Sequence, residues 1–145
     1  MKILNGSQLR QIDAQTIENE PISSFSLMER AALACSNWIQ NHISTDASFG
    51  VVCGQVNNGE DVLAIARQLK EIGYSVDVFV VQMGGKSSPD FSSNLEQLLD
   101  VLIIDQPAGS VSFDVYTHLI DSLFGVGINR AVEGLAADVI QKMNA

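Results

Sequence analysis

Four short apolar segments, separated by stretches of helical periodicity, constrain the fold of this chain more than any other feature. They comprise residues Phe49–Cys53, Ser75–Gln82, Val101–Ile104 and Tyr116–Asp121. Short, mainly apolar runs of this kind are typical of strands that are buried on both faces. Helical patterns occupy residues 62–72, 88–99 and 132–143. This alternation predicts a parallel sheet that is covered by helices on both sides.

Two further helices are expected before the first strand. Residues 7–19 carry an apolar stripe that ends before Pro21. Ser26 and Glu29 have the spacing of a capping box, which predicts that the second helix opens at Ser26. Its expected inner face consists of Met28, Ala31, Cys35, Trp38 and Ile39. Residues 1–145 are therefore expected to form a single Rossmann-like three-layer αβα domain with a mainly parallel sheet and two N-terminal helices.

The order of the strands predicts where a ligand would bind. In the common order 3-2-1-4, the direction of winding reverses between the first and the fourth strand. Ligands bind beyond the carboxyl ends of the strands at such a reversal. Residues 54–61 and 121–131 follow these two strands, so we expect them to form two walls of one crevice.

The net charge of −9 limits the classes of partner. Binding to nucleic acid needs clustered Lys and Arg, but the eight basic residues are spread along the chain. A small phosphorylated ligand remains compatible, because backbone N–H groups at a helix N-terminus can bind phosphate. No signal peptide is recognised, and no segment approaches the roughly 20 apolar residues that span a bilayer. A cytoplasmic protein without a membrane partner is expected.

The two cysteines, Cys35 and Cys53, lie in a helical pattern and at the end of a strand. We expect each to be a small buried hydrophobic residue rather than a disulfide partner or a nucleophile.

The first predicted wall lies within the stretch CGQVNNGEDV, which starts at Cys53. Asn57, Asn58 and Asp61 are polar groups between a strand and a helix. An asparagine there can cap the helix, and the glycine spacing does not match the G-x-G-x-x-G phosphate fingerprint. On its own, this loop favours a helix cap over a ligand site.

The second predicted wall has the sequence DSLFGVGINR, starting at Asp121. Gly125 and Gly127 allow the backbone to approach a ligand closely, or they make a turn. Arg130 has donors suited to a phosphate. The alternative is that Asp121 caps a local turn and Arg130 is solvated, and the loop alone does not decide between the two.

Taken together, the two stretches resemble the YjeF N-terminal domain family of NAD(P)H-hydrate epimerases. The family motif C-G-x-G-N-N-G-G-D-G, followed by A-R-x-L, is matched by Cys53-Gly54, Asn57-Asn58-Gly59, Asp61 and Ala66-Arg67-Gln68-Leu69. The motif D-x-L-F-G-x-G-L-x-R is matched by Asp121, Leu123-Phe124-Gly125, Gly127 and Arg130. The opening MKILNGSQLRQIDAQTI and the segment LMERAA also fit.

The resemblance implies an isomerase that interconverts the R and S epimers of hydrated NADH or NADPH, so that a dehydratase can repair both. It implies a potassium ion bound by Asn58 and Asp121, with Asp121 also the candidate for acid–base catalysis. The implied ligand-binding residues are Asn57, Asn58, Gly59, Asp61, Gly125, Val126, Gly127 and Arg130. A homodimer is also implied, with the two N-terminal helices as its candidate interface.

Three family glycines are replaced here, by Val56, Glu60 and Val62. Glu60 suits a helix N-terminus, and for the same reason it competes with an anionic ligand. The family's later D-x-P-S-G motif has no counterpart, so the domain is expected to be incomplete relative to the family. These departures keep a second hypothesis open, a catalytically inactive ligand-binding or dimerisation module on the same fold.

Overall fold

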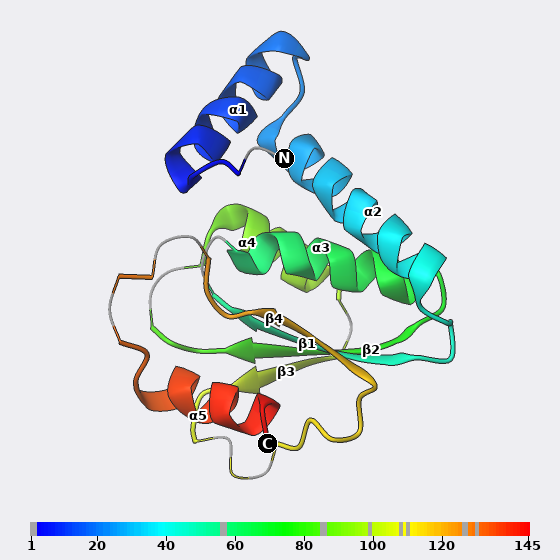
Figure 1. Cartoon of the computed structure of the whole chain (residues 1–145), viewed down its shortest axis with the longest axis vertical. Helices are drawn as coiled ribbons and strands as arrows, with labels where there is room; N and C mark the ends of the chain where they lie inside the picture. Colours follow the sequence, from blue (N-terminus) through cyan, green and yellow to red (C-terminus); the bar gives the residue numbers. More distant parts are fainter. Residues whose placement is uncertain are drawn as a thin grey trace.

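The sheet forms as the apolar pattern predicts. The computed structural model describes residues 3–55, 58–84, 87–98, 100–107, 109, 111–125, 128–129 and 131–145. Its strands are β1 (Ser48–Gly54), β2 (Ser75–Val81), β3 (Val101–Ile104) and β4 (His118–Ser122). They lie in the order β3-β2-β1-β4, and all three pairings are parallel (Figure 1). The parallel sheet is confirmed, and so is the reversal of winding between β1 and β4.

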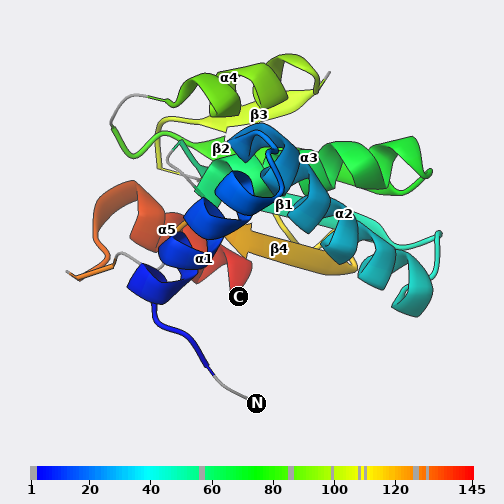
Figure 2. The ribbon, with the colours of Figure 1, turned by 90° about the horizontal axis from the view of Figure 1, so that it is seen from above.

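Helices cover both faces of the sheet. They are α1 (Gly6–Asn19), α2 (Ser24–His42), α3 (Asn58–Glu71), α4 (Pro89–Glu96) and α5 (Gly134–Met143). Figure 1 shows α3 and α4 on one face and α5 on the other, with α1 outermost. Seen from above in Figure 2, α4 lies near β3, whereas α2 and α3 lie over β1. The three-layer αβα architecture is therefore confirmed. Among the described residues, no helix has the length and apolar character that crossing a membrane requires.

Side chains of β1 alternate between two hydrophobic cores. One core, under α3 and α4, contains Phe49, Val51 and Cys53 of β1, with Val62, Ala66, Leu69 and Phe91 from the helices. The other core, against α5, contains Val52, Phe79, Leu123 and Val139. Successive strand residues point to opposite faces of a sheet, so a strand buried on both faces needs an uninterrupted apolar run.

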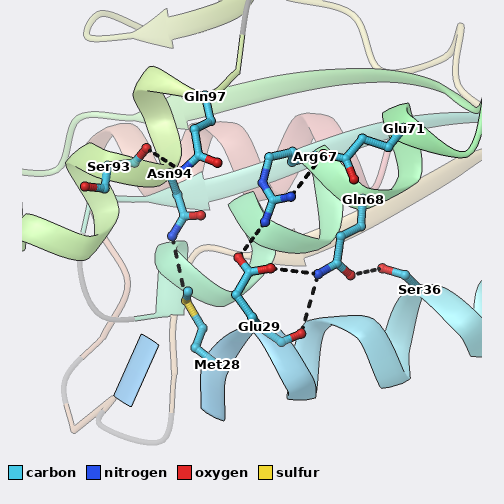
Figure 3. A network of polar contacts seen from close by, with 9 residues as sticks. All are labelled: Met28, Glu29, Ser36, Arg67, Gln68, Glu71, Ser93, Asn94 and Gln97. Atoms are coloured by element: carbon cyan, nitrogen blue, oxygen red, sulfur yellow. Dashed lines mark hydrogen bonds and ion pairs between the residues drawn. The ribbon is translucent and has the colours of Figure 1, made fainter. Parts of the chain in front are cut away.

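The start of α2 differs from the prediction. Its N-cap is Ser23, whose hydroxyl oxygen accepts the Ser26 backbone N–H at 3.0 Å. Glu29 takes no part in a capping box. Figure 3 shows Glu29 pointing from α2 toward Arg67 and Gln68 on α3. The predicted capping box is wrong because the Ser23 hydroxyl already accepts a backbone N–H at the N-terminus of α2. Glu29 is therefore available for a contact between helices.

The predicted inner face of α2 is also largely wrong. The buried residues of this helix are Ala32 and Ser36, with Ile39 and Ile43 half-buried on the same stripe. Trp38 is 58% exposed and stacks on His42. The Ser36 hydroxyl donates to Gln68 at 2.9 Å, so a polar contact with α3, rather than the most apolar stripe, orients the helix.

Further residues of that predicted face also point outward. Ala31 and Cys35 are exposed, so the burial predicted for Cys35 is wrong. Several element boundaries shift by a few residues. The helix predicted to reach Leu99 ends at Glu96, the last strand begins at His118, and the closing helix begins at Gly134.

Candidate functional site

The two loops nominated by the topology begin side by side. Cys53 of β1 pairs with Ser122 of β4, so both strands end at the same edge of the sheet. A Cβ atom on Gly54 would lie 3.0 Å from the Leu123 carbonyl oxygen and 2.5 Å from the Met83 methyl carbon. The end of β1 therefore lies close to the chain that leaves β4, and a side chain at position 54 would require Met83 and Leu123 to shift.

Asp121 stands at this edge on β4 with an exposed side chain. One of its carboxylate oxygens, Oδ1, accepts the Leu123 backbone N–H at 3.0 Å. This is the local turn expected as the alternative to a ligand contact. The same bond holds an exposed carboxylate at the carboxyl end of a strand, where a ligand can reach it.

In the first loop, α3 begins at Asn58, and Gly59 is buried directly behind it. A Cβ atom on Gly59 would lie 2.3 Å from the Gly54 carbonyl oxygen and 2.6 Å from the Phe91 ring. The glycine of the Asn-Asn-Gly motif thus lets the N-terminus of α3 pack against β1 and α4. Val56, Asn57 and the Asn58 side chain lie outside the described part of the chain.

Negative charge gathers at the N-terminus of α3. Asp61 has an exposed side chain, yet partial loss of water around its carboxyl group raises the pKa of Asp61. The carboxylates of Glu60 and of Asp13 on α1 raise this pKa further. Like charges disfavour ionisation of a neighbour, and in the same way they oppose an anionic ligand group at this position.

A cavity of about 770 Å³ opens at the carboxyl ends of β2 and β4. Three of the lining residues come from the connection after β2. The others come from the loop after β4, which supplies both apolar and polar side chains, and from the start of α5. The lining residues are Gln82, Met83, Gly84, Phe124, Gly125, Ile128, Asn129, Ala131, Val132, Glu133, Leu135 and Ala136. The Glu133 side chain, at the N-cap of α5, makes no capping hydrogen bond. The first turn of α5 is thus open to an acceptor from elsewhere.

The cavity only partly matches the predicted crevice. Residues of the 121–131 loop line it, including Gly125, whereas Val126, Gly127 and Arg130 lie outside the described residues. Gln82, Met83 and Gly84 also line it, and among the described residues none of the 54–61 loop does. Met83 and Leu123 lie over Gly54 and cover the end of β1. The predicted strand order 3-2-1-4 could have indicated this wall, because it places the second strand, and therefore the residues that follow it, beside the first strand.

The burial predicted for Cys53 is confirmed. Cys53 is fully buried in the core, and burial raises the pKa of its thiol to about 12. A thiol with such a pKa stays protonated near neutral pH. Within the described residues, no group of three or more His, Cys, Asp or Glu side chains could hold a metal ion.

Comparison with known proteins identifies related sequences over nearly the whole chain. The family model described as YjeF-related protein N-terminus matches residues 24–145. A protein named NAD(P)H-hydrate epimerase from Limosilactobacillus fermentum is 35% identical over 98% of this chain and 68% of the relative. A bifunctional NAD(P)H-hydrate repair enzyme Nnr from Thermofilum pendens is 29% identical over 99% of this chain and 29% of its own length.

A solved structure has the same fold. The crystal structure of a yeast protein, ynu0, matches with a TM-score of 0.73 and 19% sequence identity. The match covers 99% of this chain and 67% of the yeast chain.

Proposed function

Because this chain belongs to the YjeF-related N-terminal family, we propose that it interconverts the R and S epimers of hydrated NADH and NADPH. In this family, relatives named NAD(P)H-hydrate epimerase carry that function. Substrate and product are isomers, so the reaction consumes no further cofactor.

The cavity at the carboxyl ends of β2 and β4 is the observation that supports this proposal most. Its volume of about 770 Å³ falls within the range of small-molecule sites. Met83, Phe124 and Ile128 offer apolar surface for a ring. Gln82 and Asn129 offer amide groups for hydrogen bonds.

Asp121 is the proposed proton-transferring group. Its carboxylate is exposed at the edge of the sheet where the loops after β1 and β4 begin. The proposed binding groups are the ones the motifs supply: Asn57, Asn58, Gly59, Asp61, Gly125, Val126, Gly127 and Arg130. Gly125 lines the cavity, which supports its inclusion.

Potassium is the proposed metal ion, with Asn58 and Asp121 as ligands. An amide oxygen and a carboxylate oxygen are donors that suit a hard cation. Asp121 fits this role because its carboxylate is exposed and its turn with Leu123 orients it. The bound ion would supply positive charge for oxygen atoms of the ligand.

The test uses one purified epimer of hydrated NADH, incubated with the protein in potassium buffer and followed by chromatography. Conversion faster than in a protein-free control is expected, with loss of that acceleration in Asp121→Asn. Replacing potassium with sodium is expected to slow the reaction. Conversion that survives Asp121→Asn would remove the assigned role of this residue.

The second hypothesis predicts a different result from the same assay. A non-catalytic ligand-binding module would bind NAD(P)-type ligands in calorimetry and leave the epimer ratio at its spontaneous rate. If the protein is an epimerase, we further propose that it acts in the cytoplasm beside an NAD(P)H-hydrate dehydratase, as a homodimer. The naming of one relative as a bifunctional repair enzyme supports the link to a dehydratase.

A further inference from the structure

Glu60 and Ser88 connect the N-termini of α3 and α4. The Ser88 hydroxyl donates a hydrogen bond to the carboxylate of Glu60, in the first turn of α3. The same oxygen accepts the Phe91 backbone N–H at 3.0 Å and so caps α4. A hydroxyl has one proton and two lone pairs, so Ser88 makes both bonds at once.

The helices are closely packed beneath this bond. Phe91 is 1% exposed, and its ring lies against the Cα position of Gly59. The first turns of α3 and α4 are therefore joined twice, by packing through Phe91 and by the hydrogen bond between Ser88 and Glu60.

Described residues at both ends of the connection between β2 and α4 are anchored. Its first residues, Gln82, Met83 and Gly84, line the cavity. The Gln82 backbone N–H donates to the Ile104 carbonyl at 2.8 Å, which anchors the β2 end. Ser88 is the last residue before α4, so its bond to Glu60 anchors the other end.

We propose that Glu60 is a positioning residue, whose carboxylate acts through Ser88 to hold the cavity wall formed by Gln82, Met83 and Gly84 in place. The identity of the ligand rests on the function proposed above. A carboxylate suits the role because charge-assisted hydrogen bonds are stronger than neutral ones. Negative charge at the N-termini of α3 and α4 is also favoured by both helix dipoles.

The first test measures epimerase kinetics in Glu60→Ala, in Ser88→Ala and in the double variant. Glu60→Ala is expected to raise KM about five- to tenfold, the effect of losing one hydrogen bond, with kcat within about twofold. Ser88→Ala also removes the cap of α4 and is expected to raise KM at least as much. The double variant is expected to have the KM of Ser88→Ala, because that change already removes the bond to Glu60 together with the cap of α4. Ser88→Thr retains the hydroxyl and is expected to restore KM. Glu60→Gln keeps the shape without the charge and is expected to give an intermediate KM.

Matched controls are Glu96→Ala and Ser93→Ala, which remove exposed side chains from α4 and are expected to leave KM unchanged. A wild-type KM in Glu60→Ala, or a double variant whose effect is the product of the single effects, would overturn the proposal.

The second test needs no turnover. Hydrogen exchange at the amides of residues 82–84 is expected to be faster in Glu60→Ala than in the wild type, with the amides of β1 unchanged. Equal exchange rates at residues 82–84 would overturn the positioning role. If the wild-type protein leaves the epimer ratio unchanged, the proposed function fails, and hydrogen exchange still decides the role of Glu60.

Discussion

Glu29 and Arg67 form an ion pair across the interface of α2 and α3, with 2.5 Å between the carboxylate oxygen and the guanidinium nitrogen. Their side chains are only 25% and 17% exposed. Gln68 adds a hydrogen bond to the same carboxylate at 3.2 Å, and Glu71 pairs with Arg67 at 3.1 Å (Figure 3). Glu29 and Arg67 are 38 residues apart, so this network attaches the N-terminal helices to the rest of the fold.

Removing the Glu29 carboxylate is expected to destabilise the protein. Glu29→Ala leaves Arg67 without its best-buried partner and should lower the free energy of unfolding by about 2–3 kcal/mol. The pair between Arg30 and Glu20 has the same 2.5 Å separation, but both side chains are about half exposed. Glu20→Ala should therefore cost less than about 1 kcal/mol. Urea denaturation of the two variants tests the difference, and equal losses would contradict it.

Gly59 is expected to resist substitution although it lies in a helix. Alanine is favoured over glycine by about 1 kcal/mol at an exposed helix position. Here, however, the new Cβ would lie 2.3 Å from a backbone oxygen that cannot move freely. Gly59→Ala should thus lower the free energy of unfolding by about 2–3 kcal/mol. Gly109→Ala is the control, since among the described residues its Cβ would meet only the Pro107 carbonyl oxygen, at 3.8 Å. A midpoint of thermal unfolding for Gly59→Ala equal to or higher than that of the wild type would refute this contact.

Tyr116 should make stability depend on pH in the alkaline range. Its hydroxyl donates to Asp77 at 2.7 Å, and burial, with help from Asp77, raises the pKa of Tyr116 to about 12. In the unfolded chain this pKa is about 10, so stability is retained below about pH 10 and is lost as the pH rises toward 12. The stability difference between wild type and Tyr116→Phe should therefore shrink between about pH 8 and about pH 11. A constant difference in urea denaturation would count against the hydrogen bond.

The single tryptophan reports on the outer face of α2. Trp38 is 58% exposed in this structure and stacks on His42 at 4.4 Å. Acrylamide should therefore quench the native fluorescence almost as efficiently as that of the urea-unfolded chain. Measurement at low and high protein concentration provides the control. If quenching of Trp38 by acrylamide becomes weaker as the protein concentration rises, a second copy of the chain covers this face. The proposed homodimer could produce that result.

Much of the fold was predictable because its signals are local. The apolar run of β1 reflects burial on both faces, and Ser88 with Pro89 marks the start of α4 as expected. Gly73 follows the end of α3 with a φ of 99°, a backbone conformation that glycine adopts most easily. Such preferences act between residues that are a few positions apart, so a single sequence shows them.

The candidate site was predictable only in part, because its walls depend on which strands are neighbours. The loop after β4 was predicted to be one wall of a ligand site, and its Gly125 lines the cavity, while the site itself stays a prediction. Gln82, Met83 and Gly84 also line the cavity, and the methyl carbon of Met83 lies against Gly54. No pattern within either segment records that contact.

The sequence by itself determined the alternation of buried strands and helices, the family motifs, the start of α4 and the ends of α1 and α5. Tertiary structure alone decided what Glu29 and Glu60 do. Both were interpreted from local helix rules, and both bond instead to residues at least 28 positions away, Arg67 and Ser88. A carboxylate can satisfy a nearby backbone N–H or a distant side chain at similar free energy. The packing of the helices therefore selects the partner.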